Sequence, residues 1–196
     1  MKLLCEYTEL KYDRDLLTES IDANKPLILK NVVLQKAETK NQNGRVYPRD
    51  VLMREAATYK KNFVDQRRAL GELDHPESPI VNLKNACCNV VNIWTDDMAV
   101  MGDVEILTTP TGNIVKELIR NNIRLGVSSR GLGSVKQMDE STVEVQQDFS
   151  LVCFDIVSNP STFGAFINES VSPDIVVVNK YTHINSLVHD FLSEVK

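Results

Sequence analysis

The sequence predicts an α+β fold in which a mostly antiparallel β-sheet or barrel is surrounded by helices. About six or seven segments have the apolar, β-branched composition of strands, whereas only about three have the spacing of helices. These helices do not alternate regularly with the strands, which argues against a wound parallel sheet. At 196 residues, the chain is long enough to bury one full hydrophobic core.

The expected strands follow from apolar runs and from turn residues between them. Residues 26–34 are apolar and β-rich, and they predict a buried strand. Residues 86–106 predict two strands that form a hairpin around a break at Thr95-Asp96-Asp97. Further strands are expected near Leu3-Leu4 and at 125–135, 142–145 and 149–157.

The expected helices have apolar side chains on one side. Asp50 is expected to cap a helix that runs to about Phe63. A short helix is expected at 114–122, and an amphipathic one at 184–195. Prolines and a glycine predict an irregular stretch at 69–82. We therefore expect one domain over residues 1–180, followed by a helical tail over 181–196.

Charge and hydropathy exclude two classes of partner. The formal net charge is −5, and no long block of basic residues occurs, so we expect no nucleic-acid partner. No apolar run of about 20 residues is present, so no membrane span is expected. The apolar stretch at the N-terminus is too short for a signal peptide, and the chain is expected to be cytoplasmic.

The cysteines and histidines do not form a metal-binding pattern. Cys5, Cys87, Cys88 and Cys153 lack the spacing of a zinc site, and we expect them to be reduced and to behave as small apolar residues. The sequence therefore predicts no metal and no cofactor.

His75 is the histidine best placed for chemistry. It lies in Gly71-Glu72-Leu73-Asp74-His75-Pro76, where a loop could present the side chain to a cleft. His183 and His189 lie near the C-terminus in a polar and helical context that suits surface or packing roles. A lone loop histidine is commonly a surface residue, so His75 needs a reactive partner.

The pair Ser128-Ser129 supplies a candidate nucleophile. Small residues surround it, which lets a substrate backbone approach, and free N–H groups beside a serine can form an oxyanion hole. Side chains alternate along a strand, so only one of the two serines can face the histidine. The residues alone leave open which serine this is, and a serine- and glycine-rich turn without catalytic function is the alternative.

A serine nucleophile needs a base, and the base needs an orienting partner. Asp155 stands out because it interrupts the apolar run Leu151–Val157, where a carboxylate is costly unless it is paired. Asp74 is adjacent to His75, but neighbouring side chains rarely point at each other. The remaining candidates are Asp103, Asp139 and Asp148.

Two of these segments together resemble the prohead core proteases of T4-like tailed phages. They are Gly71 to Pro76 and Gly126-Val127-Ser128-Ser129-Arg130-Gly131-Leu132-Gly133-Ser134, and Asn43-Gly44-Arg45-Val46-Tyr47-Pro48 adds to the likeness. The resemblance implies a serine endopeptidase that acts in the host cytoplasm inside the immature capsid, where it degrades the scaffolding core and trims capsid proteins. It also implies a β-barrel surrounded by helices, similar to the herpesvirus assemblins.

The resemblance also implies roles for particular residues. His75 matches the catalytic histidine, and Ser129-Arg130-Gly131 fits the Ser-x-Gly pattern of the wider group, so Ser129 is the predicted nucleophile. In assemblins the third catalytic residue is a histidine on a later strand, but this chain has no histidine between Ser129 and His183. Asp155 lies at a comparable distance downstream, so it is the predicted catalytic acid. The backbone amides of Arg130 and Gly131 are expected to form the oxyanion hole.

The family cleaves after glutamate in a (Leu/Ile)-x-Glu context. Ile167-Asn168-Glu169 fits this context, so Glu169 is the predicted self-cleavage site, and Glu19 and Glu194 end further matches. A glutamate at the cleaved position needs a cationic pocket, for which Arg45, Arg124 and Arg130 are candidates.

The implied partners are phage scaffold and capsid proteins, and the family suggests a homo-oligomer. The alternative is a catalytically silent capsid component that keeps the fold and binds scaffold. A general small-molecule hydrolase is disfavoured, because the chain lacks Gly-x-Ser-x-Gly.

Overall fold

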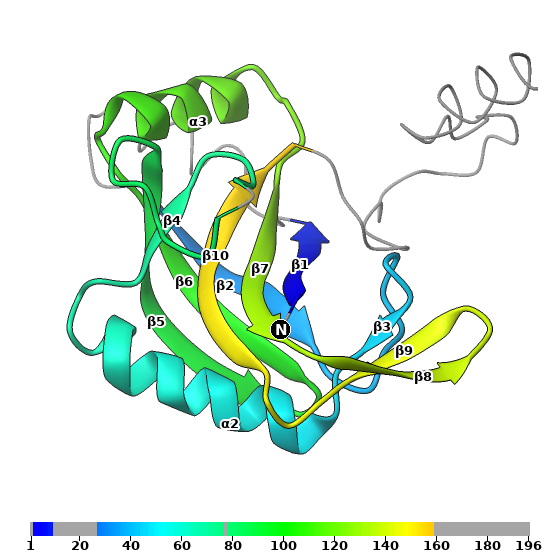
Figure 1. Ribbon diagram of the computed structural model, residues 1–196. Helices are drawn as coiled ribbons and strands as arrows, with labels where there is room; N and C mark the ends of the chain where they lie inside the picture. Colours follow the sequence, from blue (N-terminus) through cyan, green and yellow to red (C-terminus); the bar gives the residue numbers. More distant parts are fainter. Residues whose placement is uncertain (1, 10–26, 77, 159–196) are drawn as a thin grey trace, which may run out of the picture. The chain divides into compact units, whose positions relative to one another are not determined.

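The structure is a computed structural model that describes residues 2–9, 27–76 and 78–158 (Figure 1). These residues belong to one compact unit of the chain, Met1–Ala165. Several predictions lie outside the described residues: the helix at 184–195, the tail over 181–196 and the cleavage site at Glu169.

The larger sheet has four antiparallel strands in the order β2-β6-β5-β4. They are β2 (Leu27–Lys36), β6 (Ala99–Ile106), β5 (Ala86–Asp96) and β4 (Leu70–Glu72). The predicted strand at 26–34 and the predicted hairpin are both confirmed. The hairpin turns between the paired residues Asp96 and Ala99, where Asp97 has a φ of 49° that aspartate tolerates better than most residues.

A second, three-stranded antiparallel sheet has the order β1-β7-β10. Its strands are β1 (Lys2–Glu9), β7 (Gly126–Gly133) and β10 (Ser150–Val157). β7 is the middle strand, so it is hydrogen bonded on both sides (Figure 1). This sheet brings the serine pair of β7 next to the strand that contains Asp155.

The third sheet has the order β3-β9-β8 and lies beside the second (Figure 1). Its strands are β3 (Arg45–Val46), β9 (Thr142–Val145) and β8 (Val135–Asp139), and β3 pairs parallel to β9. The sequence does not predict β3, β4 or β8, because so few residues show no clear alternation. β4 lies within the stretch predicted to be irregular, where the prolines follow the strand and do not interrupt it.

Two helical segments match predicted ones. α2 (Arg49–Tyr59) continues into the π-helical segment η1 (Lys60–Val64). The predicted cap is wrong, because Pro48 occupies the N-cap position and Asp50 lies in the first turn. α3 (Pro110–Arg120) begins earlier than predicted, because Thr109 caps it by accepting a hydrogen bond from Gly112 N at 3.1 Å and Pro110 suits the first turn.

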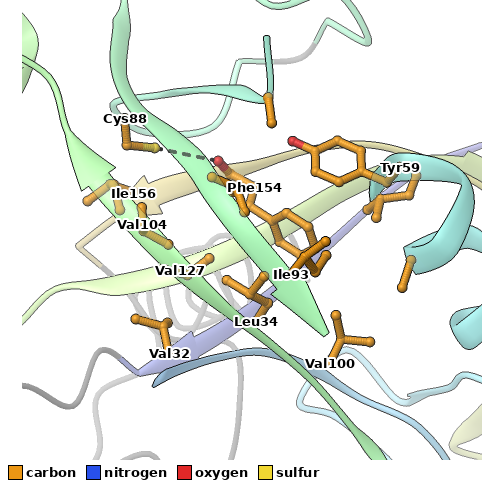
Figure 2. Packing of buried hydrophobic residues seen from close by; sticks show 14 of the residues in the cluster. Val32, Leu34, Tyr59, Cys88, Ile93, Val100, Val104, Val127, Phe154 and Ile156 are labelled. Carbon is orange, nitrogen blue, oxygen red and sulfur yellow. Dashed lines mark hydrogen bonds between the residues drawn. The ribbon is translucent and has the colours of Figure 1, made fainter. Parts of the chain in front are cut away.

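The hydrophobic core contains residues from α2, from the larger sheet and from β10 (Figure 2). The rings of Tyr59 and Phe154 meet edge to face, with centroids 5.4 Å apart. On the other side of Phe154, its carbonyl accepts a hydrogen bond from Cys88 Sγ at 3.7 Å (Figure 2). The core therefore fixes which face of β10 is apolar.

The two larger sheets meet at both edges but do not form one continuous ladder. Leu73, just after β4, makes an isolated parallel bridge with Ile156 of β10. At the other edge, Thr8 Oγ1 of β1 donates to the carbonyl of Leu34 in β2 at 3.2 Å. The described strands form three sheets. No single closed barrel is found among them, so the predicted barrel is not confirmed. The mostly antiparallel class is confirmed, and the likeness to herpesvirus assemblins stays a prediction.

Two simpler observations complete the fold. All four cysteines are free; Cys87, Cys88 and Cys153 are buried, as expected of small apolar residues, whereas Cys5 is partly exposed. Within the described residues, no helix is both long and apolar enough to cross a bilayer.

Candidate active site

β7 divides its side chains between the two faces of its sheet. Val127 belongs to the hydrophobic core, and Ser129 lies on the same face because side chains alternate along a strand. Ser129 is paired with Phe154 of β10, which is also a core residue. Ser128 and Arg130 therefore lie on the opposite face, where both are buried.

Asp155 lies directly opposite Ser128 in the β7–β10 ladder. Directly opposed residues in antiparallel strands share a face, so the carboxylate and the hydroxyl lie on the same side of the sheet. Both sequence neighbours of Asp155, Phe154 and Ile156, belong to the core. The strand can thus bury Asp155 without placing its charge in the apolar core.

His75 reaches this face from the larger sheet. β4 approaches β10 so closely that a Cβ added at Gly71 would lie 1.8 Å from the carbonyl oxygen of Phe154, and only glycine permits this approach. The backbone N–H of Asp74 then donates to the carbonyl of Ile156 at 2.8 Å. Asp74 has a φ of 68°, and the turn that it makes directs the chain so that His75 meets Asp155.

Three side chains form a continuous chain of contacts. His75 Nδ1 lies 2.9 Å from Asp155 Oδ2, and His75 Nε2 is hydrogen bonded to Ser128 Oγ. A carboxylate can only accept, so Nδ1 donates to Asp155 and Nε2 is left to accept from the hydroxyl. The His75 side chain is 24% exposed, whereas that of Asp155 is fully buried, so the histidine forms the more exposed part of the site.

The prediction that Ser129 is the serine beside the histidine is wrong, because the contact is made by Ser128. The Ser-x-Gly pattern does not say which face of a strand a serine occupies. The apolar pattern does carry that signal: Val127 marks the core face of β7, and the apolar neighbours of Asp155 mark the core face of β10. The predicted proximity of His75 and Asp155 is confirmed.

Beside these three residues lies a buried ion cluster that the sequence does not predict. Arg130 Nη2 lies 2.8 Å from Glu72 Oε1, and Arg130 Nε lies 3.0 Å from Asp155 Oδ2. The side chains of Arg130, Glu72 and Asp155 have no exposed surface. Buried charges are tolerated when they are paired, and here one guanidinium serves two carboxylates.

The burial of Arg130 corrects one predicted role. A side chain without exposed surface cannot line a substrate pocket, so the prediction that Arg130 contacts a substrate glutamate is wrong. Arg45 pairs with Glu6 at 2.8 Å and is 23% exposed. Its role in substrate binding stays a prediction, as does that of Arg124.

The predicted oxyanion hole involves the backbone of the middle strand. Arg130 lies opposite Cys5 of β1 and Cys153 of β10, and the β10 register shifts between Leu151 and Cys153. No described contact tests whether the amides of Arg130 and Gly131 face a substrate, so this role stays a prediction.

The thiols near the site are not competing nucleophiles. Burial, followed by the charge of Asp155, raises the pKa of Cys5 to about 11. The same two causes raise the pKa of Cys153 far above its usual range. Both thiols therefore stay protonated at neutral pH, and a thiol is a much weaker nucleophile than a thiolate.

The contacts define what this site can do chemically. A serine hydroxyl hydrogen bonded to a histidine, which a buried carboxylate orients, is the arrangement that activates serine as a nucleophile. Among residues 2–9, 27–76 and 78–158, no group of three or more His, Cys, Asp or Glu side chains is arranged to hold a metal ion.

Residues 15–176 match the family described as prohead core protein serine protease. The chain belongs to this family. The resemblance carried by the His75 and Ser128-Ser129 segments is thereby confirmed, and the family description agrees with a site built around a serine.

Two relatives show how far the similarity extends. The prohead core protein protease of Enterobacteria phage T4 is 32% identical over 148 residues, which cover 73% of this chain and 69% of the phage protein. The solved structure of the bacteriophage T4 capsid assembly protease is 25% identical, with a TM-score of 0.69. It matches 81% of this chain and 98% of its own.

Proposed function

We propose that this prohead protease is a serine endopeptidase that degrades scaffold and core proteins and trims capsid proteins as the prohead matures. The contact chain Ser128–His75–Asp155 is the observation that supports the proposal most strongly. Family membership supports a protease of the prohead. The proposed place of action is the inside of the immature capsid in the host cytoplasm.

The proposed mechanism uses Ser128 as the nucleophile. As Ser128 Oγ attacks the scissile carbonyl, His75 Nε2 takes its proton, and Asp155 stabilises the imidazolium through the Nδ1 hydrogen bond. His75 then gives the proton to the departing amine, which leaves an acyl-enzyme. Water attacks this ester with His75 as the base, and the acid product leaves as Ser128 regains its proton.

The proposed specificity is cleavage after glutamate in a (Leu/Ile)-x-Glu context, with self-processing after Glu169. A synthetic peptide of residues 162–175 contains Ile167-Asn168-Glu169-Ser170 and is a direct probe. The wild-type protein is expected to cut it after Glu169, as read by mass spectrometry. The peptide with Glu169→Gln is the matched control and is expected to stay intact.

The serine pair gives the decisive test of the nucleophile. Ser128→Ala is expected to lower kcat by about 10⁴-fold or more, whereas Ser129→Ala keeps the triad contacts and most of the activity. A fluorophosphonate, which reacts with activated serines, is expected to label Ser128. A label on Ser129, or full activity of Ser128→Ala, would contradict the assignment.

The same experiments address the alternative function. If the wild-type protein neither cuts the peptide or a phage scaffold protein nor reacts with the fluorophosphonate, a catalytically silent capsid component becomes the better description.

A further inference from the structure

Arg130 is wholly buried and yet contacts the chain on both sides of His75. Its Nη2 donates to Glu72 Oε1 at 2.8 Å, and its Nη1 donates to the carbonyl oxygen of Ser78. Glu72 lies three residues before His75, and Ser78 lies three residues after it. The guanidinium therefore holds the segment that contains His75 through two contacts, one before and one after the histidine.

The same guanidinium holds the carboxylate of Asp155. Arg130 Nε lies 3.0 Å from Oδ2, and Nη2 donates to Oδ1 at 3.1 Å. Nε itself donates to Cys153 Sγ at 3.2 Å, so its contact with Oδ2 is an ion pair, and the backbone N–H of Glu72 donates to Oδ1 at 2.9 Å. These donors fix the rotation of the carboxylate so that Oδ2 also faces His75 Nδ1. A planar guanidinium can do this because its donors diverge in a fixed geometry.

We infer that Arg130 is the positioning residue of this site, which sets both the Asp155 carboxylate and the segment that contains His75. The inference rests on the proposed roles of Ser128, His75 and Asp155. Arg130 has no exposed surface, so it acts through these residues and not on the substrate.

The effect of the charge of Arg130 can be tested separately from the effect of its geometry, because two carboxylates share its guanidinium. Arg130→Met alone leaves the Glu72 carboxylate buried without its cation. Adding Glu72→Gln removes one positive and one negative charge together, so the formal charge of the cluster returns to its original value. Replacing a buried ion pair by uncharged groups of similar volume is often neutral for stability.

The double variant Arg130→Met/Glu72→Gln is the central test. Its melting temperature is expected to recover most of what Arg130→Met loses. Its kcat on the 162–175 peptide is expected to stay about 100-fold below wild type with KM little changed, because small displacements of catalytic groups have effects of this size. If kcat recovers together with the melting temperature, Arg130 is only a counter-ion, and the inference is overturned.

Arg130→Lys keeps the positive charge but loses the planar set of diverging N–H donors. A single ammonium cannot reach Asp155, Glu72 and the Ser78 carbonyl together, because the native contacts use three different nitrogens. A loss in kcat of about 100-fold is again expected.

Leu34→Ala is the matched control, because it opens space at a buried site on β2, outside the cluster. It is expected to lower the melting temperature and keep kcat at an assay temperature well below melting. An equal loss of kcat in Leu34→Ala would overturn the inference.

A second readout does not depend on turnover. The proton that His75 Nδ1 donates to Asp155 is expected to give a far-downfield NMR signal, assigned by its loss in His75→Gln. This signal is expected to move upfield or broaden in Arg130→Lys and in the double variant. An unchanged signal in both folded variants would overturn the inference, even if the wild-type protein cuts nothing and the proposed function fails.

Discussion

The buried carboxylates of Glu6 and Asp155 lie on opposite faces of the β1-β7-β10 sheet, and their surroundings suit different roles. Glu6 is paired in the β1–β7 ladder with Ser129, whereas Asp155 is paired in the β7–β10 ladder with Ser128. Both carboxylates are buried, and each forms an ion pair with an arginine. The difference between the two sites lies in the remaining hydrogen-bond donors.

Among the described residues, the donors to the Glu6 carboxylate all come from the segment of residues 41–47, which includes β3. Its donors are Asn41, Asn43, Arg45 and Tyr47. Together they hold this segment, which follows β2 in the chain, against β1. The arrangement holds the chain in place, and none of these four described donors is a histidine that could transfer a proton to a serine.

Asp155 receives one donor of a different kind. Arg130 and the Glu72 amide are buried and structural, but His75 is partly exposed and touches Ser128 with its other nitrogen. A buried carboxylate thus acquires a chemical role when one of its donors can exchange a proton with a reactive neighbour.

The largest expected effect breaks the Asp155 site and leaves the Glu6 site intact. Asp155→Asn is expected to lower kcat on the 162–175 peptide by about 10⁴-fold, because the amide favours the wrong histidine tautomer and cannot stabilise the imidazolium. Glu6→Gln is the matched control on the other face and is expected to keep kcat. A loss of less than about 10-fold in a folded Asp155→Asn protein would place the acid elsewhere.

A change at Glu6 is expected to affect stability and not activity. Glu6→Gln is expected to lower the free energy of unfolding by about 3 kcal/mol, because an amide cannot accept all four hydrogen bonds and the pairing with Arg45 is lost. Denaturant titration measures this loss. The exposed pair of Glu117 and Arg120 provides the control, since Glu117→Gln is expected to cost about 0.5 kcal/mol or less. Equal losses in the two variants would contradict a special role for Glu6.

Two buried tyrosines differ in whether their hydroxyls have a hydrogen-bond partner. Tyr47 donates to Glu6 at 2.8 Å, whereas the buried hydroxyl of Tyr59 has no hydrogen-bond partner among the described residues. Tyr47→Phe is expected to cost about 2 kcal/mol, and Tyr59→Phe about 0.5 kcal/mol or less, because only the first change removes a hydrogen bond to a charged group. Thermal or chemical unfolding of the two variants checks this order, which a larger loss in Tyr59→Phe would contradict.

At neutral pH these two hydroxyls have no titration effect on stability, but in alkali they are expected to cause a gradual loss of it. Burial raises the pKa of Tyr47 and of Tyr59 well above the ordinary tyrosine value of 10.0. The folded state therefore keeps two protons that the unfolded chain releases above about pH 10, and stability falls as the pH rises past that point. Each tyrosine adds at most about 1.4 kcal/mol per pH unit. The double variant Tyr47→Phe/Tyr59→Phe is expected to lose stability less steeply, and an unchanged slope would contradict the assignment.

Much of the fold could be predicted from local sequence. The long strands β2, β5, β6 and β10 and the helix α2 contain enough residues to show their apolar pattern. The short strands β3 and β4 could not be predicted, because their conformation depends on distant partners: β3 pairs with β9, and β4 with β5. Whether the sheets close into one barrel also depends on contacts between distant strand edges, which no local pattern records.

For the site, sequence patterns were enough to predict the family and to single out His75 and Asp155 as catalytic partners. The contact of Ser128 with His75, and the buried pair of Arg130 and Glu72 beside it, became visible in the folded structure alone. The reason is physical. The type of each residue and the apolar pattern around it can be read from the sequence. Strand register, in contrast, is set by the packing of the core. A shift of one residue in the β7–β10 register would place Ser129 where Ser128 now lies.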